Sequence, residues 1–253
     1  EHGGTVEEVK VALAELGAQV TKLGRRTPFD EGEFDIVVTV GGDGTLLQAS
    51  HHVGNTPILG INSSPSTSVG FFCGIRSGEV MPALRSALRG KLKRATLARM
   101  QVSVDGDVID ARVLNDALFC HRSPAATSRY ILEKGSIVEE QKSSGFWVGP
   151  AAGSTAAQRS AGGKVLPLAS RKMQLVVREP YTPHGESYRL AHALFSPDEK
   201  LLVRSKSRDM RMYLDGPDNM IKIGLGQIVT FEISSQPLLL LGISSRRKWG
   251  EVK

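Results

Sequence analysis

The sequence predicts an α/β domain with a mostly parallel sheet, followed by a β-rich domain of the sandwich type. In residues 1–94, stretches with apolar residues at helical spacing alternate with short apolar runs of strand length, which is the order that builds parallel sheets. From residue 95, short alternating stretches punctuated by turn residues take over, as in antiparallel sheets. We therefore expect domains at 1–94 and 95–233, with a tail at 234–253 that packs back on the first domain.

The first domain is expected to open with a helix within residues 5–23, which Gly17 ends and a short strand follows. The apolar run Asp-Ile-Val-Val-Thr-Val (35–40) predicts one buried strand. Gly-Gly-Asp-Gly-Thr (41–45) then forms a turn, and residues 46–52 open the next helix. A strand that leads through glycines into a helix is a common way of presenting backbone amides to a phosphate.

The remaining elements follow the same reasoning. Pro57 introduces a second buried strand at 58–62, and residues 79–92 form an amphipathic helix. In the second domain, Asp105-Gly106 predicts a hairpin. The strands expected there lie within residues 98–120, 128–135, 145–149, 172–180 and 211–216, and the tail strand lies within residues 229–243.

Composition excludes several function classes. The 253 residues, 40% hydrophobic, are enough for two modest domains with their own cores. The net charge of +6 permits anionic partners, but the basic residues are dispersed and aromatic residues make up only 6%, so we expect no nucleic-acid partner. No stretch approaches the ~18–20 apolar residues that span a bilayer, so we expect no membrane association.

The cysteines and histidines indicate no metal site of the protein's own. Cys73 and Cys120 form neither a disulfide framework nor a zinc pattern, which fits a reducing compartment, and the six histidines lack metal-ligand spacing. The composition suggests a bacterial cytoplasmic protein. Because the chain opens with Glu1 rather than Met, a missing transit segment would instead place it in a mitochondrion or another organelle.

The loop at 41–45 combines glycines with a carboxylate. Gly41, Gly42 and Gly44 allow positive φ and a close approach of the backbone to an anion, whereas Asp43 would repel that anion. Neither the P-loop pattern nor the dinucleotide pattern fits, the latter because Leu47 stands where its third glycine belongs. A tight strand-to-helix turn capped by Thr45 is the alternative interpretation.

Several motifs resemble those of the NAD kinase family. Gly-Gly-Asp-Gly is shared by NAD kinases with diacylglycerol and sphingoid lipid kinases and, more loosely, with phosphofructokinases. Val-Gly-Phe-Phe-Cys-Gly (69–74), Leu-Asn-Asp-Ala-Leu-Phe (114–119) and the glycine-rich stretch 149–163 resemble further family elements in order and spacing. The glycine-rich stretch separates NAD kinases from lipid kinases. Together with Lys-Ser-Ser-Gly-Phe-Trp-Val-Gly (142–149), it resembles the divergent branch that includes plant NADH kinase and animal mitochondrial NAD kinase.

The resemblance implies a two-domain NAD kinase-like fold and an activity. Such enzymes transfer the terminal phosphoryl of ATP, or in some members of polyphosphate, to the 2′-hydroxyl of the adenosine ribose of NAD⁺ or NADH. Asp43 would act as general base on that hydroxyl, because a ribose hydroxyl is a poor nucleophile until its proton is accepted. Mg²⁺ or another divalent cation would arrive with ATP. The family also implies a homodimer or a higher homo-oligomer.

The resemblance assigns the remaining site residues. Asn115 and Asp116 match an Asn-Glu pair that holds the adenosine part of the dinucleotide; Asp116 is one methylene shorter, and a simple Asn-Asp turn is the alternative. Ala157 stands in place of a tyrosine and Ser144 in place of an aspartate, while Lys142 keeps a basic position. The residues expected to contact nucleotide are Gly41, Gly42, Gly44, Thr45, Phe71, Asn115, Asp116, Lys142, Ser144, Gly153, Ser154, Thr155, Ala156, Ala157 and Ser160.

Two other functions stay open at this point. One is a lipid kinase of the diacylglycerol type, or another small-molecule kinase of the same superfamily; the other is a non-catalytic nucleotide-binding regulator. Ser154 is not expected to be a serine nucleophile, because Ala156 stands where that motif needs glycine. The sequence leaves open the choices between NAD⁺ and NADH and between ATP and polyphosphate.

Overall fold

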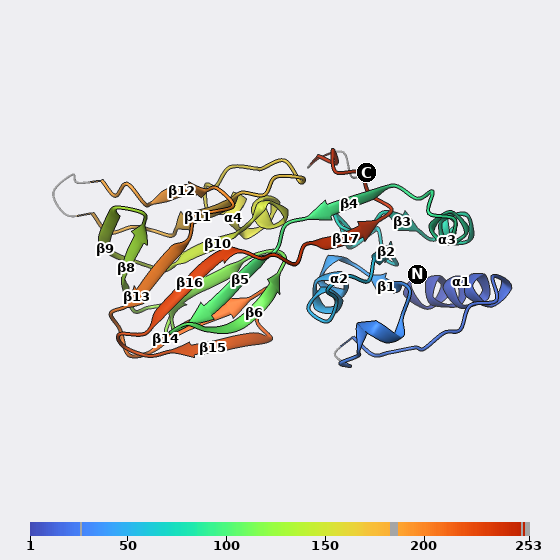
Figure 1. Ribbon diagram of the computed structural model, residues 1–253, viewed down its shortest axis with the longest axis horizontal. Coiled ribbons are helices and arrows are strands. Elements are labelled where there is room, and N and C mark those ends of the chain that lie inside the picture. Colours follow the sequence, from blue (N-terminus) through green and yellow to red (C-terminus); the bar gives the residue numbers. More distant parts are fainter. Residues whose placement is uncertain (26, 183–186, 249, 251–253) are drawn as a thin grey trace. The chain divides into compact units, whose positions relative to one another are not determined.

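The structure is a computed structural model that describes residues 1–25, 27–182, 187–248 and 250. The chain divides into two compact units, seen in Figure 1. Unit 1 comprises Glu1–Leu97 and Pro237–Lys253, and unit 2 comprises Ala98–Gln236. The boundaries expected at residues 94 and 233 precede the observed ones by a few residues.

Unit 1 is an α/β unit with a mostly parallel sheet, as predicted. The strand order is β1-β2-β17-β4, with β3 also paired to β2; only the pairing of β17 with β4 is antiparallel. Its elements are α1 (His2–Glu15), the 3₁₀ turn η1 (Glu31–Glu33), β1 (Val37–Gly41), α2 (Asp43–Ser50), β2 (Ile58–Asn62), β3 (Ile75–Arg76), α3 (Val80–Leu88), β4 (Arg94–Leu97) and β17 (Leu238–Leu241).

The central strand β2 separates the helices of unit 1. Leu59 and Ile61 belong to the core cluster that α1 and α3 also line, with Val9 and Leu84 among its members. Gly60 points the other way, where a Cβ would lie 2.8 Å from a Leu46 methyl carbon of α2. β2 is therefore buried on both faces, as expected for a strand of a parallel sheet covered by helices.

Two expectations for this unit are wrong. Among the described residues between α1 and β1 none forms a strand, and residues 18–23 are exposed. Their apolar side chains Val20 and Leu23 stay largely exposed, so periodicity alone was not enough to form a strand. The run 35–40 is not one buried strand either: β1 starts at Val37, lies at the edge of its sheet and buries only Thr39 fully.

The helix after β1 also differs from the expectation. α2 begins at Asp43 rather than at residue 46, so the loop's carboxylate lies in the first helical turn. The N-cap is Gly42, and Thr45 lies inside the helix instead of capping it. The other helix predictions hold with shifted ends: α1 starts at His2, and Gly17, with φ 69°, follows its last turn as a stop.

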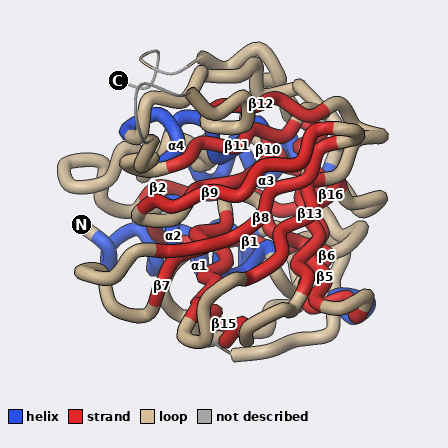
Figure 2. Tube along the Cα trace, turned by 90° about the vertical axis from the view of Figure 1, so that its left-hand side faces the viewer, coloured by secondary structure: helices blue, strands red, loops and turns tan. Residues whose placement is uncertain are grey.

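Unit 2 is a β-sandwich of two six-stranded antiparallel sheets, which confirms the predicted β-rich domain. One sheet has the order β12-β11-β10-β7-β14-β15 and the other β6-β5-β16-β13-β8-β9; the neighbours β9, β8, β13 and β16 can be followed in Figure 2. The elements are β5 (Met100–Val104), β6 (Asp107–Val113), β7 (Ala117–His121), β8 (Ser128–Lys134), β9 (Ile137–Ser143), β10 (Phe146–Pro150), the 3₁₀ turn η2 (Ala151–Thr155), α4 (Ala157–Ser160), β11 (Met173–Val177), β12 (His192–Phe195), β13 (Leu201–Ser205), β14 (Met210–Leu214), β15 (Asn219–Ile223) and β16 (Ile228–Ile233).

An aromatic cluster fills the sandwich. Phe119 of β7 stacks on Phe146 of β10 with ring centroids 5.1 Å apart, and Tyr130 of β8 and Phe231 of β16 meet Phe146 edge-on. All four side chains are fully buried, and they come from both sheets. Their burial and edge contacts supply much of the cohesion between the sheets.

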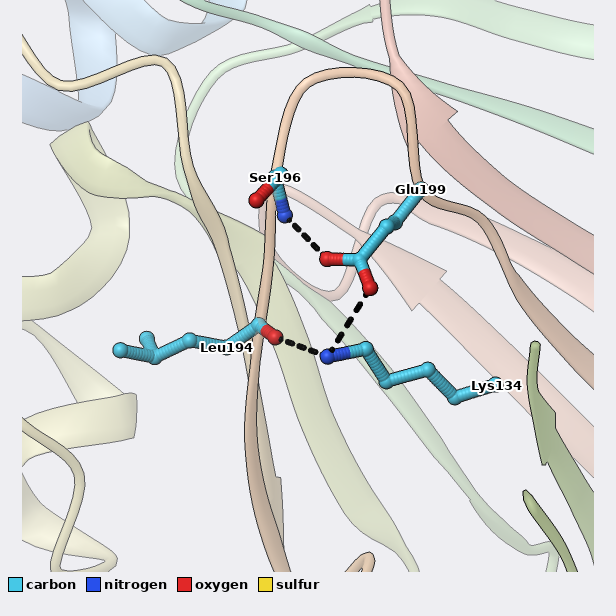
Figure 3. Close-up of polar contacts among 4 residues, drawn as sticks. All are labelled: Lys134, Leu194, Ser196 and Glu199. Carbon is cyan, nitrogen blue, oxygen red and sulfur yellow. Dashed lines mark hydrogen bonds and ion pairs between the residues drawn. The ribbon is translucent and has the colours of Figure 1, made fainter. Parts of the chain in front are cut away.

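A polar contact at the rim also joins the two sheets (Figure 3). Lys134, at the end of β8, donates to the carbonyl of Leu194 in β12 at 2.6 Å and lies 3.3 Å from the carboxylate of Glu199. The other oxygen of Glu199 accepts the amide of Ser196 at 2.7 Å. The hydrogen bond from the Ser196 amide and the nearby charge of Lys134 lower the pKa of Glu199. The carboxylate therefore stays charged beside the lysine.

The last strand, β17, belongs to unit 1. It pairs in parallel with β2 and antiparallel with β4, so it lies inside the sheet. Among the described residues, no helix is long and apolar enough to cross a membrane.

Candidate active site

In unit 1, the carboxylate of Asp43 is held by the loop that follows β2. One oxygen accepts the amide of Phe71 at 2.8 Å and the other accepts the amide of Phe72 at 2.7 Å. Gly70, with φ 61°, turns the chain before these amides, and a Cβ there would collide with Asn62 of β2. The Val-Gly-Phe-Phe-Cys-Gly stretch therefore orients the carboxylate of the Gly-Gly-Asp-Gly-Thr loop.

The glycines of this loop are needed for space rather than for positive φ. Gly41, Gly42 and Gly44 are absent from the described positive-φ residues, so that expectation is wrong. A Cβ at Gly41 would lie 2.3 Å from the Thr45 hydroxyl, and one at Gly42 would lie 2.4 Å from the Ser68 hydroxyl. The side chains of Thr45 and Ser68 thus occupy the space where side chains at Gly41 and Gly42 would lie. The first amides of a helix need partners from outside the helix.

The tail contributes a cation to this site. Arg247 donates to the carbonyl of Gly70 at 3.4 Å, and its guanidinium carbon lies 5.8 Å from the centre of the Phe71 ring. Burial lowers the pKa of Arg247, while the charge of Asp43 opposes that shift. Burial and the charge of Asp43 raise the pKa of the neighbouring Cys73 thiol to about 12, so this cysteine is not a thiolate nucleophile.

In unit 2, Asn115 and Asp116 lie in the short connection between β6 and β7. Asp116 is 6% exposed, and burial, followed by the charge of Asp215, raises its pKa to about 8. The carboxylate of Asp215 accepts the amides of Leu114, Asn115 and Asp116. The pair is therefore part of a braced connection rather than a simple exposed turn.

The glycine-rich stretch packs directly against this connection. A Cβ on Gly153 would lie 1.6 Å from the carbonyl oxygen of Asn115, and one on Gly149 would lie 2.4 Å from the same atom. Gln158 of α4 donates to that carbonyl at 3.4 Å. Asn115 and Asp116 are thus brought together with η2 and the start of α4.

The hydroxyl of Ser154 is used within the fold. The side chain is fully buried, donates to the carbonyl of Ala151 at 2.6 Å and accepts the amide of Leu166 at 2.9 Å. Thr155, Ala156 and Ala157 are partly exposed and Ser160 is exposed, so these residues can reach a ligand. Ser154 shapes the turn that presents them.

Lys142 and Ser144 lie elsewhere in unit 2. Lys142 is in β9 and Ser144 precedes β10, whereas η2 follows the other end of β10, roughly 17 Å further along the strand. The amide of Ser144 donates to the carbonyl of Arg178 at 3.0 Å, and the carbonyl of Lys142 accepts the amide of Tyr181 at 2.8 Å. Within unit 2 these two residues do not join the group around Asn115.

The sequence did not identify two residues that contact the candidate site residues, Arg247 and Asp215. Arg247 stood in a basic cluster near the end of the chain that carried no motif. Asp215 precedes Gly216 in a hairpin turn, and an Asp-Gly pair signals only the turn itself. Neither contact could be found without the three-dimensional structure.

Comparisons with known proteins agree with this architecture. The family of the ATP-NAD kinase N-terminal domain matches residues 8–91. The chain is 35% identical over 230 residues to a probable NADH kinase of Oryza sativa subsp. japonica, covering 82% of this chain and 70% of that protein. It is 36% identical over 235 residues to an NADH kinase of Arabidopsis thaliana, covering 82% and 72%. The crystal structure of an NAD kinase from Archaeoglobus fulgidus in complex with ATP superposes with a TM-score of 0.77 at 26% identity, covering 94% of this chain and 89% of that one.

The fold is that of a two-domain nucleotide kinase, with an α/β unit followed by a β-sandwich. The 35% identity to the rice protein, over 82% of this chain and 70% of that protein, identifies one family within this class. The chain belongs to the NAD kinase family, and the expected likeness to plant NADH kinases is confirmed.

Proposed function

We propose that this chain is an NAD(H) kinase, which transfers the terminal phosphoryl of ATP to the 2′-hydroxyl of the adenosine ribose of NAD⁺ or NADH. In this proposal the carboxylate of Asp43 accepts the hydroxyl proton as the new P–O bond forms and the bond to the ADP leaving group breaks. Asn115 and Asp116 hold the adenosine part of the dinucleotide, and backbone amides at the start of α2 donate to phosphate oxygens.

The observation that carries the proposal is the position of Asp43. The chain belongs to the NAD kinase family, and the carboxylate of Asp43 lies in the first turn of α2. The amides of Phe71 and Phe72 hold this carboxylate at 2.8 and 2.7 Å. A carboxylate held in this way is oriented before substrate arrives, as efficient proton acceptance requires.

The residues fit a divalent cation that arrives with ATP. Among the described residues, no group of three or more His, Cys, Asp or Glu side chains could hold a metal ion. Mg²⁺ commonly binds through one or two carboxylates plus substrate phosphates, and Asp43 is a carboxylate in the first turn of α2. When bound, the cation would neutralise charge on the phosphates.

One assay tests the proposed function. Purified protein is incubated with Mg²⁺ and ATP together with NAD⁺, NADH or diacylglycerol, and the phosphorylated products are separated and quantified. We expect NADP⁺ or NADPH and no phosphatidic acid. Phosphatidic acid would support a lipid kinase instead, and nucleotide binding without any product would support a non-catalytic regulator. The ratio of NADP⁺ to NADPH decides the preferred acceptor.

Replacing Ala157 with tyrosine should tighten dinucleotide binding. Ala157 is the first residue of α4 and is partly exposed. Phe146 could in principle supply the missing aromatic ring, but its side chain is packed in the sandwich core. A ring against the nucleotide should contribute ~0.5–1.5 kcal/mol, which lowers KM for the dinucleotide about two- to tenfold with kcat unchanged. Ala157→Leu is the control for bulk without a ring. Weaker binding in Ala157→Tyr would show that the partly exposed Trp147 already fills the space.

We also propose that the chain forms a homodimer through unit 2. Exposed apolar side chains lie on three edge strands of its sheets, namely Val108 and Ile109 on β6, Val138 on β9 and Met220 on β15. Light scattering at micromolar concentration should give twice the monomer mass. Ile109→Lys, Val138→Lys and Met220→Lys, one on each of the three edge strands, should show which edge is used, because a charge on an edge strand opposes pairing. A monomer in the unmodified protein would contradict the proposal.

A further inference from the structure

Asp215 accepts backbone amides from the connection that carries Asn115 and Asp116. It follows β14, at the turn into β15, with φ 50°, a conformation that few residues other than glycine adopt. One carboxylate oxygen accepts the amides of Asn115 at 2.7 Å and Asp116 at 3.0 Å, and the other accepts the amide of Leu114 at 2.8 Å. Charged acceptors form the stronger kind of hydrogen bond, so this contact defines the backbone of the connection closely.

The connection is fixed from both sides. The amide of Asp215 donates to the carbonyl of Asp116 at 2.9 Å, which closes a reciprocal contact. On the other side, the carbonyl of Asn115 lies against Gly149 and Gly153, which have no side chains, and accepts from Gln158. The backbone of the pair has little room to move, and its side chains are aimed by that backbone.

We propose that Asp215 is a positioning residue of the dinucleotide site, whose carboxylate sets the direction in which Asn115 and Asp116 present their side chains to the adenosine ribose. The proposal rests on the proposed function, because it is the dinucleotide that these side chains would hold. Asp215 itself touches no reacting atom.

Asp215 also contributes, after burial, to the raised pKa of Asp116. Burial and the negative charge of Asp215 together raise the pKa of the Asp116 carboxyl to about 8. Among the described residues, Gly149, Gly153 and Gln158 also pack against the connection, and these three carry no charge. An ionised carboxylate can accept ribose hydroxyls through both oxygens, whereas a protonated carboxyl uses one oxygen as a donor. KM for the dinucleotide should therefore fall as the pH rises through about 8.

Asp215→Asn tests both consequences. Asparagine tolerates the left-handed backbone, and its one carbonyl oxygen can keep the amides of Asn115 and Asp116. Its NH₂ group then faces the amide of Leu114, two donors in contact. We expect KM for the dinucleotide to rise about fivefold or more, with KM for ATP within twofold. Because a negative charge is gone, the pKa of Asp116 falls, and the pH midpoint of KM moves to lower pH.

Asp105→Asn is the matched control. Asp105 also lies in a hairpin turn of unit 2 with positive φ, 52°, and accepts the amide of Ile228 and the side chain of Gln227, both at 2.8 Å. It lies beyond the other end of β6 from Leu114, roughly 20 Å away along the strand. Asp105→Asn should change neither KM for the dinucleotide nor the pH midpoint of that KM. Asp215→Glu keeps the charge but moves it by one methylene, so it should raise KM without moving the midpoint to lower pH, and it replaces the asparagine variant if that variant does not fold.

The outcomes separate the two proposals. If the unmodified protein makes no NADP⁺ or NADPH, the proposed function fails, and Asp215 has no dinucleotide site to serve. If the unmodified protein is active and Asp215→Asn behaves like Asp105→Asn in KM and in pH midpoint, the positioning role is wrong while the kinase function stands. A lower melting temperature with both kinetic readouts unchanged would likewise assign Asp215 to folding alone.

Discussion

Asp43→Asn should lower kcat for NAD⁺ or NADH phosphorylation by about 10²–10⁴-fold while leaving the dinucleotide Kd nearly unchanged. The loss is that expected when a positioned general base is removed, and binding is spared because the proposed adenosine contacts lie in unit 2. Steady-state kinetics and equilibrium binding on the same preparation measure both quantities. Activity within about threefold of the unmodified protein would contradict the general-base role, since that corresponds to under about 1 kcal/mol of barrier.

The structure requires a control for this substitution. Both oxygens of Asp43 accept loop amides, so asparagine must turn its NH₂ group toward the amide of Phe71 or Phe72 and lose one hydrogen bond. Gly70→Ala disturbs the same loop but leaves the carboxylate in place, because φ 61° disfavours alanine and its Cβ would meet Asn62. If loop displacement caused the whole loss, Gly70→Ala would lower kcat as much as Asp43→Asn; we expect a far smaller effect.

Gly153→Ala should give the opposite kinetic pattern, with dinucleotide binding reduced at least tenfold. The new Cβ would lie 1.6 Å from the carbonyl oxygen of Asn115, so the backbone that carries the adenosine contacts must move. Overpacking of this kind costs about 1–3 kcal/mol, and each kcal/mol lowers the melting temperature by about 2–4 °C in a protein of this size. Binding titrations and thermal unfolding measure the two effects.

Gly224→Ala is the control for this second prediction. Gly224 lies in the same unit, has no positive φ, and its Cβ would meet only the flexible end of Gln227, at 3.3 Å. This substitution should leave binding unchanged. If Gly153→Ala bound dinucleotide as tightly as Gly224→Ala, the packing of the glycine-rich turn against Asn115 would have no role in the site.

The sequence predicted most of the fold where periodicity coincided with burial. The strand at 58–62 lies between two layers of helices, and its unbroken apolar run has that cause. The run 35–40 looked similar, but β1 lies at a sheet edge, and edge position is a property of the whole topology. The strand expected near Val20 failed for a related reason: an alternating segment becomes a strand only where it has a pairing partner and a core to cover.

The site was predictable where chemistry and motif agreed, and not where contacts cross long stretches of sequence. Asp43 and the Asn115–Asp116 pair were identified from motifs, and the glycines near them were expected to permit close approach. The amides of Phe71 and Phe72 that hold Asp43 come from almost thirty residues away. Asp215 braces Asn115 across a separation of 100 residues. Such long-range contacts depend on the order of the strands in the sheets. The identity of a single residue does not reveal that order.

The position of β17 has a consequence for the order in which the protein folds. β17 lies between β2 and β4, and β4 pairs with no other strand of the described sheet. The ribosome therefore has to complete residue 241 before the sheet of unit 1 can close. All the strands of the sandwich lie within Ala98–Gln236, so its sheets can be completed earlier in synthesis. Strands β2 and β4 are thus synthesised before the sandwich but gain their shared neighbour β17 after it, and until then their unpaired edges are open to chaperones and to misassembly.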